Sequence, residues 1–155
     1  MYSFEKMTEQ HACTIINWKY PPPYDFYNGQ GTEDELEELL HRGYMTVTNQ
    51  QGELVGYFCT GKAGTVPAGH TIGGYPDGWF DIGIGMAPML TGKGWGTIFF
   101  KEVLDFIEQQ NSVRPKRLTV ASFNKRAIRL YQKFGFVEQK RFLAGANEFV
   151  IMTGA

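Results

Sequence analysis

The glycine-rich segment at residues 91–96 constrains the fold more than any other part of the sequence. It reads Thr-Gly-Lys-Gly-Trp-Gly and joins an extended apolar run to an amphipathic helix. The helix is expected to bury an apolar face that includes Trp95, Ile98 and Phe99. The glycines leave backbone N–H groups uncovered, and a helix start adds unpaired N–H groups and a partial positive charge. The segment therefore predicts either an anion site, most often for a phosphate group, or a tight strand-to-helix connection.

A length of 155 residues predicts one domain over residues 1–155, and the order of the expected helices and strands predicts a mixed α/β (α+β) class. Strands are expected where apolar residues alternate or run together, at 2–7, 44–48, 53–60, 79–87, 117–121, 136–142 and 148–152. Four amphipathic helices are expected, and they start at Thr8, Thr32, Trp95 and Asn124. The glycine-rich stretch 61–78 contains Pro67 and Pro76 and is predicted to be a loop.

Composition and charge limit the partners that the chain is expected to bind. The formal net charge is −1, whereas nucleic-acid and membrane-surface binding usually need a basic face, so neither partner is expected. The two cysteines, Cys13 and Cys59, match no metal-binding spacing, and no metal is expected. Few cysteines, an N-terminus without a signal-peptide pattern and the lack of a bilayer-length apolar run together predict a cytoplasmic protein.

Two common phosphate-binding motifs do not match the glycine-rich segment. It lacks the GxxxxGK[ST] spacing of a P-loop, which argues against nucleoside triphosphate hydrolysis. It also lacks the G-x-G-x-x-G pattern with an acidic residue on a second strand, which argues against a dinucleotide fold. The expected phosphate ligand is therefore of another kind.

Two segments together resemble the signatures of the GCN5-related N-acetyltransferase (GNAT) family. Residues 88–96 are similar to the pattern P-x-x-[RQ]-x-x-G-x-[GA], and residues 124–136 match every fixed position of N-x-x-A-x-x-L-Y-x-x-x-G-F. The resemblance implies a mostly antiparallel sheet that splays at the cofactor strand, with about four helices. It also implies that acetyl-CoA (coenzyme A) donates an acetyl group to a primary amine. Direct transfer in a ternary complex is expected, because neither cysteine lies near a motif.

Thr91 departs from the family pattern, which usually has Arg or Gln at this position to help hold the pyrophosphate of coenzyme A. A threonine still offers a hydroxyl hydrogen bond, but it brings no charge. Lys93, two residues later, would supply the missing charge. Cofactor binding is therefore still expected, and a coenzyme A-binding sensor or interaction module without turnover is the alternative.

The resemblance assigns most of the cofactor site to backbone groups. The N–H groups expected to surround the pyrophosphate belong to Gly92, Lys93, Gly94, Trp95, Gly96 and Thr97. The strand around Ile84 and Met86 would pair with the pantetheine arm, and Gly83 and Gly85 would leave room for the thioester. An N–H group of this strand would also stabilise the developing oxyanion.

Several side chains are candidates for catalytic roles, and each has a plainer alternative. Tyr131, which is also expected to pack on the apolar face of its helix, would protonate the departing thiolate. Asn124 is expected to cap that helix, and family members often let the matching residue touch the cofactor arm. Asp81 is the first candidate for the base that deprotonates the amine, unless it is a solvated strand end or pairs with a basic side chain. Glu53 is a second candidate, whereas His70 is expected to be solvated.

The aromatic, proline-stiffened segment 18–27 is the predicted wall of the acceptor site. Trp18, Tyr24 and Tyr27 would contact an amine or an aromatic side chain, in part by cation–π attraction, unless the segment only packs locally. The sequence leaves the identity of the acceptor open: a protein N-terminus, a lysine, an antibiotic and a polyamine are all candidates. The expected partner is therefore a small-molecule or peptide amine. Exposed edge strands near the C-terminus would also support a homodimer.

Overall fold

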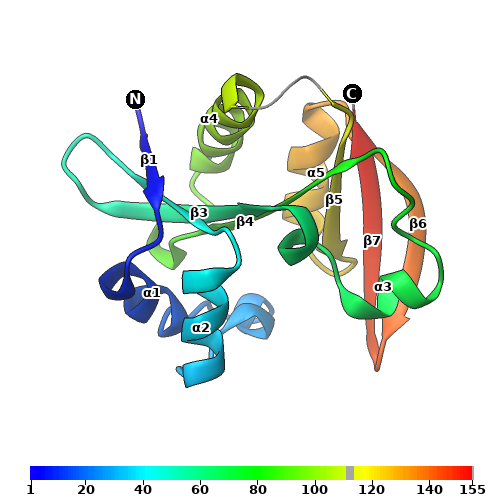
Figure 1. The fold of residues 1–155 in the computed structure, drawn as a ribbon, viewed down its shortest axis with the longest axis horizontal. Helices are drawn as coiled ribbons and strands as arrows, with labels where there is room; N and C mark the ends of the chain where they lie inside the picture. The colour runs from blue at the N-terminus through cyan, green and yellow to red at the C-terminus, as the bar shows by residue number, and fades with distance from the viewer. Residues whose placement is uncertain (111–113, 155) are drawn as a thin grey trace. The chain divides into compact units, whose positions relative to one another are not determined.

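The computed structural model describes residues 1–110 and 114–154, which fall into two compact units (Figure 1). Unit 1 comprises Met1–Cys59 and Ile84–Phe106, and unit 2 comprises Thr60–Gly83 and Ile107–Ala155. Each unit is therefore built from two separate stretches of chain. The single domain expected over residues 1–155 stays a prediction.

Seven strands of the described residues form a mixed sheet with the order β1-β2-β3-β4-β5-β7-β6. Their bounds are β1 Ser3–Lys6, β2 Met45–Thr48, β3 Leu54–Thr60, β4 Phe80–Met86, β5 Lys116–Ala121, β6 Val137–Ala144 and β7 Asn147–Gly154. The pairs β1–β2, β2–β3, β5–β7 and β6–β7 are antiparallel, and β4 pairs with β5 in parallel at Phe80, Asp81 and Ile82. The predicted mixed α/β fold with a mostly antiparallel sheet is therefore confirmed.

The helices of the described residues are mostly short. The α-helices are α1 Glu9–Ile16, α2 Glu33–His41, α3 Pro67–Thr71, α4 Trp95–Gln110 and α5 Lys125–Lys133, and the 3-10 helices are η1 Tyr24–Tyr27, η2 Gly61–Gly64 and η3 Pro88–Leu90. Among these described segments, none combines the length and the apolar character that a membrane-spanning helix needs.

Helices α1 and α2 of unit 1 begin at the capping residues that the sequence predicts. The side chain of Thr8 accepts a hydrogen bond from the N–H group of His11 at 3.2 Å. Thr32 and Glu35 form a capping box, in which each side chain satisfies a backbone N–H group of the other. The two helices share one small buried cluster, formed by Ala12, Ile15, Ile16 and Leu39.

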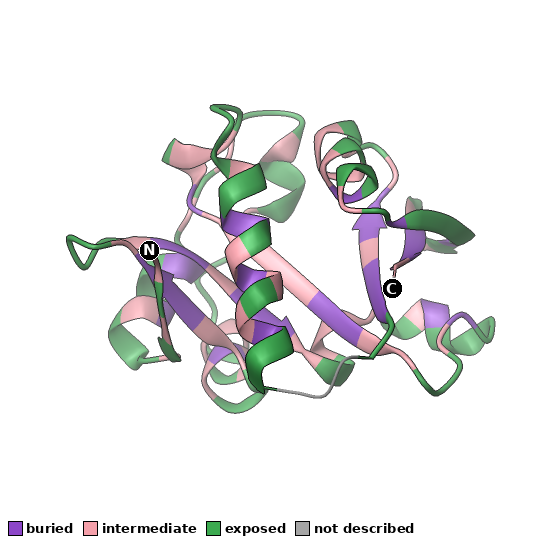
Figure 2. Cartoon of the chain, turned by 90° about the horizontal axis from the view of Figure 1, so that it is seen from above, coloured by how far each residue is buried: buried purple, intermediate pink, exposed green. Residues whose placement is uncertain are grey.

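Helix α4 turns a narrower apolar face inward than the sequence predicts. Phe99, Phe100 and Val103 are almost fully buried, whereas Trp95 and Ile98 are 45% and 38% exposed. The predicted burial of Trp95 and Ile98 was wrong. The buried face of α4 includes Phe100 and is therefore rotated away from Ile98, and Trp95 lies at the exposed start of the helix. Figure 2 shows such buried stripes, in purple, beside exposed faces, in green.

Unit 2 contains two short helices, η2 and α3, within the stretch 61–78 that was predicted to be a loop. Helix α3 begins with Pro67, whose missing N–H group needs no partner at a helix start. Gly69 permits close packing, since a Cβ atom there would lie 2.6 Å from the ring of Tyr75 and 3.0 Å from that of Phe142. The loop prediction was wrong here because this packing stabilises a five-residue helix that is too short to leave a periodic pattern.

Helix α5 of unit 2 follows its predicted start and stop. The side-chain oxygen of Asn124 accepts a hydrogen bond from the N–H group of Ala127 at 3.1 Å. Gly135 follows the helix with a φ angle of 88°, which glycine adopts without strain. The core of this unit is formed mainly by strands β5 and β7, through Leu118, Val120, Val150, Ile151 and Met152.

Candidate functional site

The glycine-rich turn of unit 1 is an open cradle of backbone N–H groups. Gly92 and Gly94 have φ angles of 72° and 83°, in the left-handed region that favours glycine. Residues 92–95 are all exposed, and a Cβ atom on Gly94 would have no other atom within 4 Å. An incoming group can therefore reach the backbone of the turn without displacing a side chain.

The start of α4 adds positive potential to this cradle. The first amides of an α-helix, here those of Trp95, Gly96 and Thr97, lack carbonyl partners within the helix. The first turn of α4 carries no acidic residue, so the positive end of the helix dipole is not neutralised there. Lys93 is exposed within the turn and contributes a full positive charge. These groups fit the pyrophosphate of acetyl-CoA.

Thr91 directs both of its hydrogen-bond donors to Pro88. Its hydroxyl donates to the carbonyl of Pro88 at 2.8 Å, and its backbone N–H group donates to the same oxygen at 3.3 Å. A hydroxyl has a single hydrogen, so Thr91 in this conformation offers a phosphate oxygen no hydrogen. Lys93 and the backbone amides are the donors that remain, and a cofactor contact by Thr91 stays a prediction.

Two tyrosines that the sequence did not single out hold the second half of β4 in unit 1. The hydroxyl of Tyr20 donates to the carbonyl of Met86 at 2.7 Å. The ring of Tyr57 lies against Gly85, where a Cβ atom would overlap the ring. The backbone of this segment is therefore fixed by aromatic side chains, and a partner strand at Met86 would use the second lone pair of its carbonyl.

The aromatic segment of unit 1 divides into a packed part and an exposed part. Trp18 stacks on Tyr57 with ring centroids 6.1 Å apart and packs against the cluster of α1 and α2. Phe26 and Tyr27 of η1 are 42% and 41% exposed and contact each other edge to face at 5.1 Å. The alternative of local packing is thus present at Trp18. A role of Trp18, Tyr24 and Tyr27 in acceptor binding stays a prediction.

The pKa of the Tyr57 phenol is raised to about 12, mainly by burial and to a smaller extent by neighbouring Cys59 and Tyr27. Burial is also the main cause of the raised pKa of Tyr20, with Tyr57 as the smaller cause. Both phenols therefore stay protonated at neutral pH, and the Tyr20 hydroxyl keeps the proton that it donates to Met86.

Tyr131 and Asn124 lie on and before α5 in unit 2. Tyr131 is 6% exposed, and its ring meets that of Phe136 edge to face at 6.4 Å. The packing expected for Tyr131 is thus present, as is the cap formed by Asn124. The catalytic role of Tyr131 and the cofactor contact of Asn124 stay predictions.

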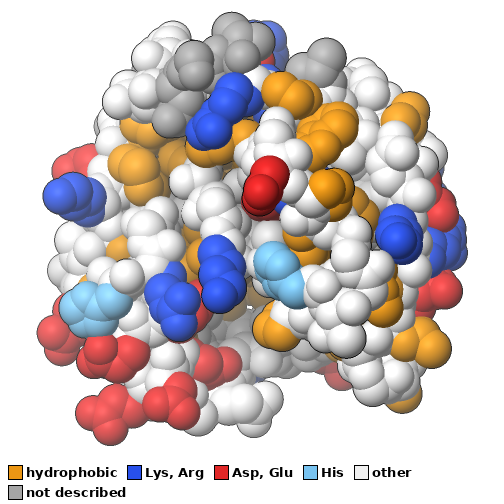
Figure 3. Space-filling model, turned by 45° about the vertical axis from the view of Figure 1, so that its right-hand side comes forward, with side chains coloured by type: hydrophobic (Ala, Val, Ile, Leu, Met, Phe, Trp, Pro, Cys, Tyr) orange, Lys and Arg blue, Asp and Glu red, His pale blue; other side chains and the backbone are white. Residues whose placement is uncertain are grey.

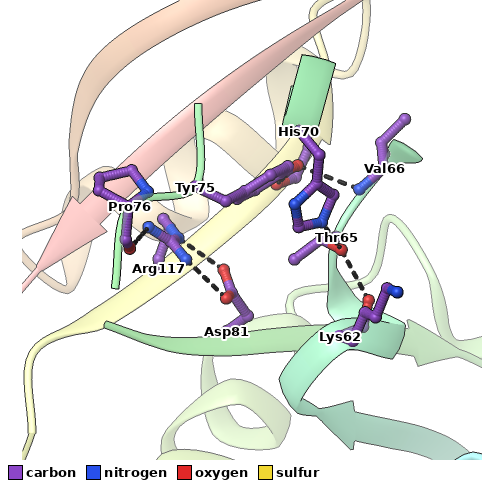
Figure 4. Close-up of polar contacts among 9 residues, drawn as sticks. Lys62, Thr65, Val66, His70, Tyr75, Pro76, Asp81 and Arg117 are labelled. Atoms are coloured by element: carbon purple, nitrogen blue, oxygen red, sulfur yellow. Dashed lines mark hydrogen bonds and ion pairs between the residues drawn. The ribbon is translucent and has the colours of Figure 1, made fainter. Parts of the chain in front are cut away.

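Asp81 of unit 2 is buried in an ion pair with Arg117, which lies opposite it in the β4–β5 register. Its two carboxylate oxygens accept hydrogen bonds from Nε and Nη2 of Arg117 at 2.6 and 2.8 Å. Arg117 also donates to the carbonyl of Pro76 at 2.9 Å and lies over the ring of Tyr75 at 4.9 Å (Figure 4). The geometry favours the alternative interpretation of Asp81, as a partner for a basic side chain, and its role as a base stays a prediction.

Glu53, the second carboxylate candidate, lies in the turn between β2 and β3 of unit 1. Its side chain accepts a hydrogen bond from the amide of Asn49 at 2.9 Å. The hydrogen bond gives Glu53 a local structural role that needs no substrate.

Charged side chains of both signs lie on the face drawn in Figure 3. Acidic side chains gather at the lower left, and Lys and Arg side chains lie at several places across this face. Helix α2 is the most acidic element, because five of its nine residues are Asp or Glu.

Comparison with known proteins identifies the family. The sequence matches the profile of the acetyltransferase (GNAT) family over residues 9–136. The chain belongs to the GNAT acetyltransferase family. Its enzyme class is therefore that of an acetyl-CoA-dependent N-acetyltransferase. A comparison with curated protein sequences gives no match.

Solved structures of similar fold agree with this assignment. Mutant forms of the spermidine/spermine N-acetyltransferase SpeG from Vibrio cholerae have a TM-score of 0.66 at 20% identity, covering 99% of this chain and 93% of that one. A provisionally assigned phosphinothricin N-acetyltransferase has a TM-score of 0.71 at 15% identity, covering 99% of this chain and 97% of that one. A provisionally assigned acetyltransferase from Acinetobacter baylyi ADP1 has a TM-score of 0.65 at 16% identity, covering 99% and 92%. At these identities the similarity shows the fold.

Proposed function

We propose that this GNAT protein moves an acetyl group from acetyl-CoA to a primary amine by direct transfer in a ternary complex. One observation carries the proposal: the exposed backbone cradle at residues 92–97, with two left-handed glycines and no acidic residue in the first turn of α4. Such a cradle favours a doubly charged phosphate ligand. In the GNAT family that ligand is coenzyme A.

Backbone groups of unit 1 would hold the donor. The amides of residues 92–97 would bind the pyrophosphate, and Lys93 would neutralise part of its charge. Ile84 and Met86 would pair their backbone groups with the pantetheine arm, beside the side-chain-free Gly85. When bound, acetyl-CoA supplies an acetyl group activated as a thioester. An N–H group of the same strand would stabilise negative charge on the acetyl oxygen during transfer.

Direct transfer needs a group that protonates the leaving sulfur. We propose Tyr131 for this step, since the hydroxyl of a phenol is acidic enough to give up its proton to a thiolate. Cys59 is buried and Cys13 is an exposed residue of α1, and neither lies near the two motifs in sequence. An acetyl-cysteine step is therefore not part of the proposal.

The acceptor in this proposal is a small-molecule or peptide amine. The exposed aromatic rings of η1 would attract its cationic or apolar part, as the cation–π effect allows. SpeG of Vibrio cholerae, with the same fold, is a spermidine/spermine N-acetyltransferase. Polyamines are therefore one class to test, together with amino acids, peptides and aminoglycoside antibiotics.

The experiment is an amine screen with acetyl-CoA in which free thiol is measured. The proposal predicts amine-dependent thiol release with at least one class and an acetylated amine by mass spectrometry. A catalytically silent coenzyme A-binding module is the second candidate. Thr91 donates its hydrogen bonds to the carbonyl of Pro88 instead of to a ligand, and the carboxylate of Asp81, the candidate base, accepts hydrogen bonds from Arg117. Such a module would bind acetyl-CoA in a calorimeter but release no thiol with any amine.

A further inference from the structure

Gly85 of β4 and Tyr57 of β3 are in direct contact within unit 1. A Cβ atom on Gly85 would overlap Cε2 and Cζ of the Tyr57 ring and would lie 2.6 Å from its hydroxyl oxygen. The phenol end of Tyr57 therefore fills the space that a side chain of residue 85 would take. Both residues are partly exposed, so a ligand can reach this place. In the proposed donor site the thioester lies beside Gly85, and it would share that space with the ring.

The ring of Tyr57 is held in place by its neighbours in unit 1. It stacks on Trp18 with ring centroids 6.1 Å apart and meets the ring of Tyr44 at 5.9 Å. It also packs against the buried cluster of α1 and α2. The backbones of β3 and β4 are close at this point, since a Cβ atom on Gly56 would lie 2.5 Å from the carbonyl oxygen of Gly85. A group that enters beside Gly85 thus meets a ring that cannot turn aside without losing this packing.

Tyr20 bounds the same part of β4 at the edge that faces away from β3. The N–H group of Ala87 donates to the carbonyl of Val55 in β3 at 2.9 Å. That N–H group and the carbonyl of Met86 belong to one trans peptide unit, in which the two groups point in opposite directions. The carbonyl of Met86 therefore points away from β3, and the Tyr20 hydroxyl reaches it there at 2.7 Å. Two aromatic side chains thus lie against consecutive residues of the strand that is proposed to pair with the donor arm.

We propose that Tyr57 sets the length of the acyl group that the protein accepts, and that its ring restricts the donor to acetyl-CoA. This inference rests on the proposed acetyl transfer, in which the donor arm lies beside Gly85. An acetyl group is the smallest acyl group with a carbon chain, whereas each further methylene has to displace the packed ring. The bonds made and broken are the same for every acyl group, so the ring selects the donor without taking part in the transfer.

The expected discrimination between donors is large enough to measure. One methylene too many or too few in an apolar pocket changes kcat/KM by about 10–200-fold. The wild-type protein should therefore use acetyl-CoA at least ~10-fold better than propionyl-CoA, and butyryl-CoA should be used less well again. Calorimetric binding should follow the same order, because an extra methylene that forces a packed side chain to move weakens the complex.

The test uses Tyr57→Leu, with Tyr57→Phe and Phe58→Leu as matched controls. Leucine keeps an apolar side chain but lacks the outer ring atoms and the hydroxyl that meet Gly85. Phenylalanine keeps the ring. Phe58 is the next residue of β3, on its opposite side, where it packs on Phe4 and Phe106. We expect Tyr57→Leu to lower the preference for acetyl-CoA over butyryl-CoA at least ~10-fold, and both controls to keep it.

Two readouts are compared for each folded variant: calorimetric binding of coenzyme A, acetyl-CoA and butyryl-CoA, and thiol release from the two acyl donors with the amine found in the screen. A wild-type protein that accepts butyryl-CoA as well as acetyl-CoA would overturn the inference. So would a folded Tyr57→Leu protein with the wild-type preference. Should Tyr57→Leu unfold at the assay temperature, Tyr57→Met takes the same test.

These outcomes separate the inference from the proposed function. Wild-type transfer of acetyl to an amine preserves the proposed function even where either overturning result is found. A wild-type protein that binds no acyl-CoA and releases no thiol with any amine removes both proposals.

Discussion

Removal of Arg117 should destabilise unit 2 far more than removal of an exposed arginine. In Arg117→Met, the carboxylate of Asp81, a buried residue, loses two charge-assisted hydrogen bonds of 2.6 and 2.8 Å, and little solvent reaches it to replace them. Breaking one partner of a buried ion pair costs about 3–5 kcal/mol. For a chain of this length that corresponds to a fall in Tm of about 6–20 °C.

The assay is thermal and urea unfolding of Arg117→Met beside a matched control, Arg141→Met. Arg141 pairs with Glu138 and Glu148, but its side chain is 42% exposed and solvent screens these pairs, so its loss should change the stability little. A double variant with Asp81→Leu and Arg117→Met should recover most of the loss, because no charge stays buried alone. Equal stability of Arg117→Met and Arg141→Met would show that the buried pair of Asp81 and Arg117 stabilises the protein no more than an exposed pair does.

Two further substitutions test the donor and the acid. Tyr131→Phe should lower kcat for thiol release while calorimetric binding of acetyl-CoA is unchanged, and an unchanged kcat would remove Tyr131 from the proton transfer. Gly94→Val should abolish acetyl-CoA binding, because a β-branched residue is strained at a φ of 83° and covers the cradle. Gly52→Val is its control, with a φ of 78° in the turn between β2 and β3; binding lost equally in both would point to unfolding instead of the cradle.

The parts of the fold that depend on local chemistry could be predicted from the sequence. The capping residues Thr8, Thr32 and Asn124 mark helix starts because a cap acts over three or four residues. Helix α3 could not be predicted in this way. It is held by the close approach of Gly69 to rings at a distance in sequence, and such contacts leave no periodic pattern.

The candidate site also has a part that could be predicted from the sequence and a part that could not. The glycine cradle consists of consecutive residues and could be predicted from them. The Tyr20–Met86 hydrogen bond joins residues 66 apart, and the Asp81–Arg117 pair joins residues 36 apart, so both depend on strand and loop placement. An arginine in a strand that also carries Leu118, Val120 and Ala121 was the available signal for a buried ion pair. His70 was expected to be solvated, and it is exposed.

An NMR titration of the backbone amides with acetyl-CoA measures whether the turn before α4 holds the donor. We expect saturable shifts of the amide signals of Gly92, Gly94 and Gly96, because these N–H groups would bind the pyrophosphate. Gly43 and Gly52, which also have positive φ angles, should not shift. Unchanged signals at the three cradle glycines under saturating acetyl-CoA would mean that the donor does not bind at this turn.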